Sequence, residues 1–202
     1  LLSILNEGLG LFRRLADREN ALRVADEASM LLKAMPEGAS KAVILTNLAT
    51  TLSAFEKPEQ SIKYYSLAED IYKNSAQKIS FEFAALLNNK SSALSSLKRY
   101  DEAENCLEDA IEILKAVKER DCEIALSLLG IAHIKFEKGS SDKEIEPLLD
   151  LAWEYINSQG QKRDSNYAFI ISKCAPSYRF FSRDLEADAL EEVAKEIYGG
   201  VK

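Results

Sequence analysis

The stretch LKRYDEAENCLEDAIEILK, residues 97–115, holds the densest group of side chains suited to acid–base or metal chemistry. Paired carboxylates hydrolyse glycosides when they face each other across a cleft, and carboxylates from several helices bind metal pairs when histidines join them. In this stretch, however, apolar residues recur at helical spacing and take the inward side, so the acids point outward. We expect a solvated helix face made of Asp101, Glu102, Glu104, Glu108, Asp109 and Glu112.

The remaining reactive side chains are too scattered to form a catalytic or metal site. His133 is the only histidine, and it falls on the apolar stripe of its segment, which favours packing over zinc or nucleophile chemistry. Cys106, Cys122 and Cys174 lack C-x-x-C spacing, so we expect reduced core residues of a cytoplasmic protein. No glycine-rich phosphate loop occurs. We therefore predict a protein that is not an enzyme, with no catalytic residue, no metal and no cofactor.

The composition of the chain excludes several other classes of protein. Glycine (8) and proline (4) are scarce among the 202 residues and 47% are hydrophobic, which argues against a disordered chain. The net charge of -7 makes nucleic acid a poor partner, because phosphate backbones are also anionic. No run of 18 apolar residues is present, so we expect no membrane-spanning segment. The apolar start is broken at residues 6–8, so it does not resemble a signal peptide.

An alanine recurs along the chain at an interval of 42 residues, or 40 at the first step, which indicates an internal repeat. Seven residues before each of these alanines stands another residue that is small or aliphatic. A spacing of seven residues marks one face of an α-helix. The alanines are Ala28, Ala68, Ala110, Ala152 and Ala194, and the residues seven positions earlier are Ala21, Ser61, Ala103, Ile145 and Ala187.

A second helical segment precedes the alanine-marked helix in the central repeats. These segments span residues 42–55, 86–97 and 125–136. Each carries a small residue that allows close helix packing: Ala49, Ser91 and Gly130. Because Gly130 follows Ser91 by 39 residues rather than 42, we interpret residues 139–141 as a three-residue insertion that restores the register.

These paired segments predict an all-α fold of about ten helices in five antiparallel pairs, in which each pair stacks on the next to bury its apolar face. The last repeat contains Pro176, so we expect its first helix to end near Cys174. We predict a single domain, with degenerate first and last repeats. The approximate repeats are 1–38, 39–78, 79–119, 120–160 and 161–202.

The pattern resembles the tetratricopeptide repeat (TPR) family, in the 42-residue form found in kinesin light chains and many bacterial proteins. The resemblance implies a right-handed α-α superhelix, or solenoid, and a non-enzymatic scaffold that mediates protein–protein interaction. The residues that carry it are Leu48, Ala49, Leu52, Ser61, Tyr65 and Ala68 in one repeat, Ser91, Leu94, Tyr100, Ala103, Leu107 and Ala110 in the next, and Leu129, Gly130 and Ala132 in a third.

The polar sides of the first helices are unusual because they are almost uncharged, whereas exposed helices usually carry Lys and Glu. In the TPR family these helices line a concave groove, and Asn47 and Asn89 stand where related repeats often have an asparagine that binds a peptide backbone. An amide can donate to a C=O and accept from an N–H. The alternative is that closely packed helices simply favour small polar residues. The candidate groove residues are Thr46, Asn47, Thr50, Ser53, Asn88, Asn89, Ser92, Ser127, Ile131 and Lys135, of which the last three make the surface more apolar.

The preferred functional hypothesis is a scaffold that binds a peptide or protein segment in this groove, with no nucleic acid and no membrane as partner. One alternative is a structural solenoid that self-associates as a homo-oligomer through apolar end faces, such as the runs FEFAALL (81–87) or FIISKCAP (169–176). Another is a ligand-sensing module of a larger regulatory protein. The step from the repeats to binding rests on analogy of fold.

Overall fold

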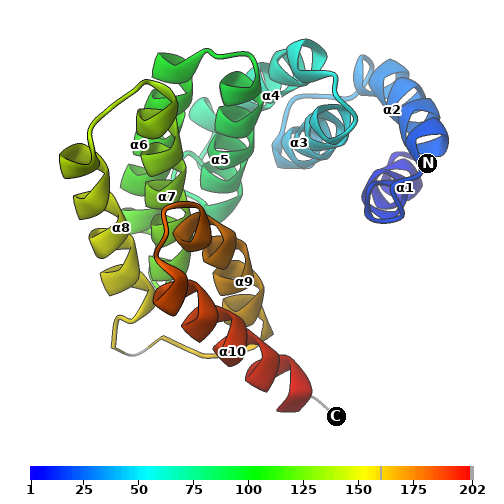
Figure 1. Ribbon diagram of the computed structural model, residues 1–202. Coiled ribbons are helices and arrows are strands. Elements are labelled where there is room, and N and C mark those ends of the chain that lie inside the picture. Colours follow the sequence, from blue (N-terminus) through cyan, green and yellow to red (C-terminus); the bar gives the residue numbers. More distant parts are fainter. Residues whose placement is uncertain (160, 201–202) are drawn as a thin grey trace. The chain divides into compact units, whose positions relative to one another are not determined.

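The structure, a computed structural model, describes residues 1–159 and 161–200, and this part of the chain contains ten α-helices and no β-strand (Figure 1). The all-α class is confirmed. None of the described helices is both long enough and apolar enough to cross a membrane. The helices are α1 (Leu2–Arg14), α2 (Arg18–Leu32), α3 (Ala39–Ala54), α4 (Pro58–Lys73), α5 (Phe81–Ser96), α6 (Tyr100–Ala116), α7 (Asp121–Glu137), α8 (Asp142–Ile156), α9 (Ser165–Phe180) and α10 (Asp184–Gly200).

Side-chain caps fix where several helices begin. The carboxylate of Asp17 accepts from the backbone N–H of Asn20 at the start of α2, and Ser80 and Asp164 cap α5 and α9 in the same way. At the start of α8, the Glu144 carboxylate accepts from the backbone N–H of Ser141, as in a capping box. These caps satisfy N–H groups that have no partner within the helix.

The predicted end of α9 near Cys174 is wrong, because the helix continues through Pro176 to Phe180. Proline removes one backbone hydrogen bond, but Pro176 lies on the exposed side. The turn that follows it is anchored by Tyr178, which is fully buried and donates its hydroxyl to the carbonyl of Leu149, 3.0 Å away. Tertiary packing therefore offsets the local cost of the proline.

Within every helix pair the same hydrogen-bonded turn joins the first helix to the second. One residue has a positive φ, and the N–H of the next residue donates to the carbonyl five residues before it. This is the pattern of a Schellman motif. The positive-φ residues are Ala16, Glu56, Lys98, Gly139 and Ser182, so successive turns are 40, 42, 41 and 43 residues apart.

These turns correct the register predicted for α7. Residues seven positions before the positive-φ residue are Ala49, Ser91 and, in α7, Ala132 rather than Gly130. Ala132 is fully buried, as Ala49 is. The supposed three-residue insertion is only one residue, because Ile145 follows its turn residue by six positions where its counterparts follow by five.

The recurring alanines of the second helices are buried as the sequence predicted. All five alanines, and the residues seven positions before them, have at most 4% of their surface exposed. The carboxylates of α6 lie on the opposite side: Asp101, Glu102, Glu108, Asp109 and Glu112 are exposed and Glu104 is half-buried. The acidic stretch is therefore the outer face of a helix whose inner face packs through small residues.

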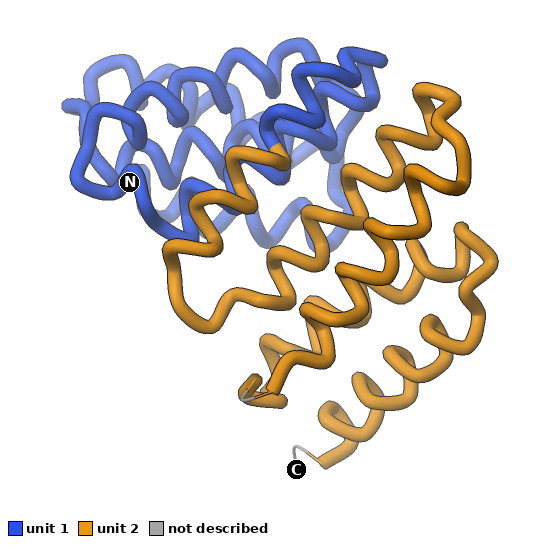
Figure 2. Tube along the Cα trace, turned by 90° about the vertical axis from the view of Figure 1, so that its left-hand side faces the viewer, with its two compact units in different colours: residues 1–106 blue, residues 107–202 orange. Residues whose placement is uncertain are grey.

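The chain divides into two compact units, and the boundary falls within α6 (Figure 2). In unit 1, residues 1–106, α1 packs on α2 and α3 on α4, while α3 also contacts α1, α2 and α5. In unit 2, residues 107–202, α7 packs on α8, α9 packs on α10, and α7 contacts α9. In both units a first helix thus contacts the first helix of the following pair.

One buried ion pair replaces apolar packing in unit 1. Lys90 in α5 corresponds, by the turn register, to the buried apolar residue Leu48 in α3. Its ammonium lies 2.5 Å from a carboxylate oxygen of Glu69 in α4, and Lys73 lies 2.6 Å from the other oxygen. Only 15% of the Lys90 side chain and 12% of the Glu69 side chain are exposed. Burial alone would raise the pKa of Glu69, but the two lysines lower it on balance.

We expect Glu69→Gln to lower the free energy of unfolding by about 2 kcal/mol at pH 7, because it removes the carboxylate that pairs with the largely buried Lys90. The lowered pKa means that Glu69 stabilises the fold above its unfolded-state value and loses this contribution as the pH falls through the folded value. The difference between the variant and the wild type should therefore shrink as the pH falls below 4.5, the ordinary glutamate value. Urea unfolding at several pH values measures it, with Glu59→Gln on the exposed side of α4 as the control.

Two helical glycines allow a matched test of close packing. A Cβ on Gly130 would lie 2.9 Å from Cδ1 of the buried Leu107, whereas a Cβ on Gly10 would meet only the guanidinium of Arg14 at 3.5 Å. Alanine favours a helix over glycine by about 1 kcal/mol. In urea unfolding, we expect Gly10→Ala to raise the free energy of unfolding by most of this amount. We expect Gly130→Ala not to raise it, because Leu107 must move to make room for the new Cβ. Equal gains at both sites would contradict the close packing of α7 on α6.

Candidate functional site

The first helices of unit 1 present the polar side chains that the sequence singled out on α3. Hydroxyls of Thr46 and Thr50 donate to backbone carbonyls four residues earlier, each at 2.8 Å. The Thr50 hydroxyl also lies 2.9 Å from the hydroxyl of Tyr65 in α4. Ser53 is half-buried one turn further along. The helix backbone and α4 thus satisfy much of the hydroxyl hydrogen bonding here.

The two asparagines differ in how they are held. The Asn47 amide donates to the side-chain oxygen of Asn6 in α1 at 2.8 Å, which ties α3 to the preceding pair. Asn89 stands at the equivalent place of α5, 42 residues on, and its side chain is exposed and makes no hydrogen bond within the described part of the chain. Beside it, Asn88 donates to Ala84 O at 3.1 Å and Ser92 donates to Asn88 O at 3.3 Å. The Asn89 amide is therefore open to solvent.

A half-buried cation borders this polar face. Arg13 in α1 donates to the hydroxyl of Thr51 at 3.3 Å, and the described residues place no carboxylate within ion-pair distance of it. Burial raises the pKa of Tyr65 to about 12, so the phenol is neutral at pH 7. Burial also lowers the pKa of Arg13, but a guanidinium keeps its proton in proteins, so the charge remains. The polar face of unit 1, defined as Thr46, Asn47, Thr50, Ser53, Asn88, Asn89 and Ser92, therefore combines amides and hydroxyls with one positive charge at its border.

The three candidate residues of α7 lie differently. Ser127 is 0% exposed and donates to Glu123 O, and Ile131 is 6% exposed, so neither is accessible to a ligand. Lys135 is half-buried. The mismatch follows from the register, because the offset from α5 to α7 is 41 residues and not 39. The true counterparts of Asn89, Ser92 and Ser95 are Gly130, His133 and Phe136.

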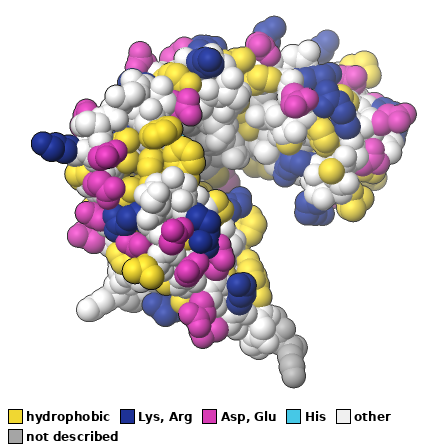
Figure 3. Space-filling model, viewed as in Figure 1, with side chains coloured by type: hydrophobic (Ala, Val, Ile, Leu, Met, Phe, Trp, Pro, Cys, Tyr) yellow, Lys and Arg dark blue, Asp and Glu magenta, His cyan; other side chains and the backbone are white. Residues whose placement is uncertain are grey.

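Two of these counterparts, His133 and Phe136, belong to a cluster of rings in unit 2 that the sequence did not reveal. The aromatic patch, as we name it, consists of His133 and Phe136 of α7 with Phe180 and Phe181 at the end of α9. The His133 ring lies 4.8 Å from that of Phe180 and 4.9 Å from that of Phe181, and Phe136 meets Phe180 edge to face at 5.0 Å. In the view of Figure 3, hydrophobic side chains gather over the ends of α7 and α9. The register set by the turn at Gly139 accounts for His133 and Phe136 but not for Phe180 and Phe181.

His133 has a packing role rather than a catalytic one within this patch. Its Nε2 lies 3.1 Å from the hydroxyl of Ser177, and the rings of Phe180 and Phe181 pack against the imidazole. Burial lowers its pKa, so the ring is neutral at pH 7. Trp153 likewise packs edge to face on Tyr178, at 5.7 Å between ring centres. Contacts between helices account for both residues.

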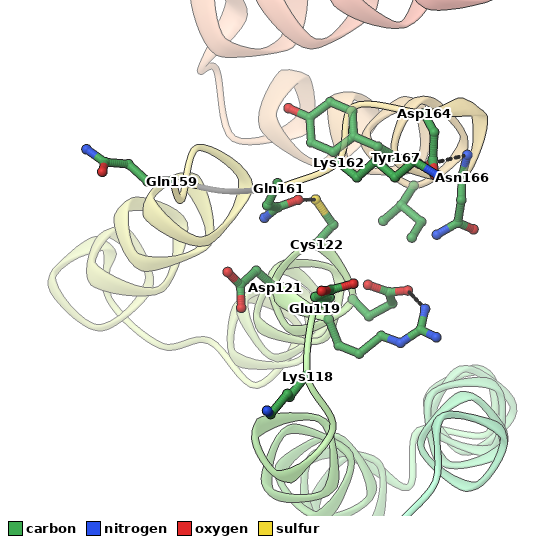
Figure 4. A pocket seen from close by; sticks show the side chains of 13 residues that line it. Lys118, Glu119, Asp121, Cys122, Gln159, Gln161, Lys162, Asp164, Asn166 and Tyr167 are labelled. Atoms are coloured by element: carbon green, nitrogen blue, oxygen red, sulfur yellow. Dashed lines mark hydrogen bonds and ion pairs between the residues drawn. The ribbon is translucent and has the colours of Figure 1, made fainter.

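A polar pocket of about 400 Å³ lies in unit 2 between the start of α7 and the segment leading into α9 (Figure 4). The Cys122 thiol donates to the side-chain oxygen of Gln161 at 2.8 Å. Several charged groups of the lining are paired: Arg120 bonds Glu123 at 3.0 Å, Lys162 lies 3.4 Å from Asp164, and the nearby Ser158 hydroxyl donates to Asp121. The pocket is therefore held together by its own hydrogen bonds.

The chemistry of this pocket does not suit nucleophilic catalysis. Burial raises the pKa of Cys122 to about 12, so its sulfur is a neutral thiol and not a thiolate at pH 7. Within residues 1–159 and 161–200, no three His, Cys, Asp or Glu side chains come together as a metal site would need. Cys106, Cys122 and Cys174 are buried, and none of them forms a disulfide within the described residues.

The fold is similar to several solved structures at low sequence identity. A putative kinesin light chain with TPR-like repeats from Podosopora anserina aligns with a TM-score of 0.70 and 15% identity over 97% of this chain and 93% of that one. BtubC (BKLC) from P. vanneervenii aligns with 0.64 and 17% over 98% and 78%, and a MamA protein with 0.56 and 17% over 96% and 90%. No curated protein sequence matches the chain.

The family comparison agrees with these structures. Residues 83–117, which comprise most of α5 and all of α6, match the model of the tetratricopeptide repeat. The helix pairs on either side of this repeat close with the same hydrogen-bonded turn. The chain thus carries a tetratricopeptide repeat at residues 83–117 and has the all-α, paired-helix fold of tetratricopeptide repeat proteins.

Proposed function

We propose that this protein is a non-enzymatic interaction scaffold that binds an extended peptide segment on the polar face of unit 1. TPR proteins are generally protein-interaction scaffolds, and the described helices show the fold on which that role depends. The observation that carries the proposal is the exposed amide of Asn89, which repeats the position of Asn47 in the preceding pair. In this proposal, as in the prediction from the sequence, the five repeats belong to one domain.

The two amides fit an extended main chain. A side-chain amide accepts from one backbone N–H and donates to one backbone C=O, so it binds a peptide without regard to the peptide's side chains. Asn47 is already oriented by its bond to Asn6, which reduces the entropy lost on binding. Arg13 adds a positive charge that favours a peptide bearing a carboxylate near this end of the face.

A cytoplasmic, reducing location belongs to the same proposal. The support for it is the burial of the three reduced cysteines, which behave as small hydrophobic residues. The ligand-sensing alternative would use the polar pocket of unit 2. The paired side chains of that pocket, Arg120 with Glu123 and Asp121 with Ser158, do not favour it, because a ligand would have to compete with these bonds.

We expect Asn89→Ala to weaken peptide binding about tenfold without changing stability, because the amide is exposed and makes no bond within the described residues. Peptides selected from a random display library on the whole chain supply the probe, and fluorescence anisotropy measures their affinity. Asn47→Ala should weaken binding too, but should also lower the free energy of unfolding by about 1 kcal/mol because its bond to Asn6 is lost.

The matched control is Asn105→Ala, the same substitution at an exposed asparagine on the outer side of α6. It should leave the affinity unchanged. If Asn89→Ala and Asn105→Ala bind every selected peptide as tightly as the wild type, the polar face is not the peptide site.

Self-association is a second candidate function, and exposed apolar residues in and beside α1 support it. The FEFAALL run is not an apolar end face, since Phe83, Ala84, Leu86 and Leu87 are buried, and in FIISKCAP only Phe169 is a large exposed apolar residue. The exposed apolar residues of unit 1 instead include Leu1, Ile4, Leu11 and Leu15. If α1 mediates self-association, Ile4→Ser with Leu11→Ser should abolish any concentration-dependent dimer in sedimentation velocity. A wild type that stays monomeric at high concentration would exclude this candidate.

A further inference from the structure

The aromatic patch of unit 2 leaves large rings open to solvent. Phe136 is 49% exposed and Phe180 is 51% exposed, although each also packs against another ring. Both come from first helices, and Phe136 stands at the counterpart of Ser95 in α5. Aromatic side chains are enriched at protein interfaces, where they bury much area at little entropic cost. The patch therefore has the composition of a docking surface.

Unit 2, which carries the patch, is acidic as a whole. Residues 1–106 contain 14 acidic and 13 basic side chains, whereas residues 107–202 contain 19 and 13, so unit 2 carries nearly all of the net charge. Phe136 is flanked in the chain by Lys135, Glu137 and Lys138. Glu137 lies close enough to His133 to oppose part of the lowering of its pKa by burial. A partner for this surface must tolerate, or use, an excess of carboxylates.

Two arginines close in sequence to Phe180 and Phe181 each bond three carboxylates. Arg179 precedes Phe180 and bonds three carboxylates, those of Asp184, Asp188 and Glu191, at 3.4, 2.8 and 3.0 Å. Arg183 follows two residues after Phe181 and bonds another three. In each group one positive charge meets three negative ones, so both groups keep a net negative charge. The carboxylates around Arg183 are Glu146, Asp150 and Glu186.

We propose that the aromatic patch binds a basic, apolar-faced segment of a partner protein. Apolar side chains of that segment cover Phe136 and Phe180, and its lysines or arginines meet the surrounding carboxylates and the open ring faces through ion pairs and cation–π contacts. This surface is separate from the polar face of unit 1, and its use does not depend on peptide binding there. A second copy of the chain is a poorer occupant, because its unit 1 is almost neutral and its unit 2 is acidic.

Two labelled peptides with opposite charge test whether the wild-type chain prefers a basic partner segment. They share leucine and phenylalanine on one helical face and differ only in carrying lysine or glutamate at every other position. We expect the lysine peptide to bind at least tenfold more tightly in fluorescence anisotropy, with an advantage that shrinks as salt is raised. Equal affinities, tighter binding of the glutamate peptide, or no binding of either would overturn the proposal.

Two serine substitutions test whether the lysine peptide binds at the aromatic patch. Phe180→Ser should weaken binding of the lysine peptide at least tenfold, since exposed aromatic anchors carry much of an interface's affinity. Phe169→Ser is the matched control, because Phe169 is a 50% exposed phenylalanine of the same helix, about three turns from Phe180 and outside the patch. It should bind as the wild type does.

Circular dichroism melting shows whether both variants fold, and Phe136→Ser replaces Phe180→Ser if the latter does not. Loss of affinity in Phe169→Ser equal to that in the patch variant would assign the binding elsewhere and overturn the proposal. Asn89→Ala should not affect the lysine peptide, so a failure here and a failure of the polar face are distinguishable.

Discussion

The hydrogen bond that closes each helix pair is the constraint on which the rest of the structure depends. In every pair an N–H donates to the carbonyl five residues earlier, across a residue of positive φ. Four of these residues are not glycine, and the left-handed conformation costs them about 1 kcal/mol each. The geometry persists because it fixes the phase of both helices at once. A small residue seven positions before the turn, such as Ala49, and one five positions after it, such as Ser61, then lie on the packed faces together.

The sequence predicted the second helices more accurately than the first, and packing explains the difference. A second helix brings Ala103 and Ala110 against its neighbours with no exposed surface, so any larger side chain at these places would separate the helices. The first helices tolerate more variation, and α7 is rich in apolar residues on several sides, with ten of its residues buried. Its periodicity therefore does not fix its phase. The register was assigned through Gly130, a true close contact with Leu107 that belongs to a different position of the repeat.

In the candidate sites too, some features are visible in the sequence and others appear only in the tertiary contacts. An uncharged helix side is visible in the sequence, and most of its members on α3 and α5 do lie at least partly open. The bond from Asn47 to Asn6 is not visible, because it joins residues 41 positions apart through the packing of two helices. The aromatic patch was hidden for a further reason, since Phe180 and Phe181 lie beyond a proline that was expected to end α9.

Equivalent places on one backbone can therefore carry opposite chemistry. At the positions of Ser92 and Ser95 in α5, α7 has His133 and Phe136, while the turn that orients both helices is the same. The repeat constrains the buried residues closely and the first-helix face hardly at all. Polarity, charge and aromatic content on that face are then free to change from pair to pair without any cost to the core. In this chain the first-helix faces differ between the units: unit 1 is nearly neutral and bears amides, whereas unit 2 is acidic and bears aromatic rings. Each unit therefore needs its own test for a partner.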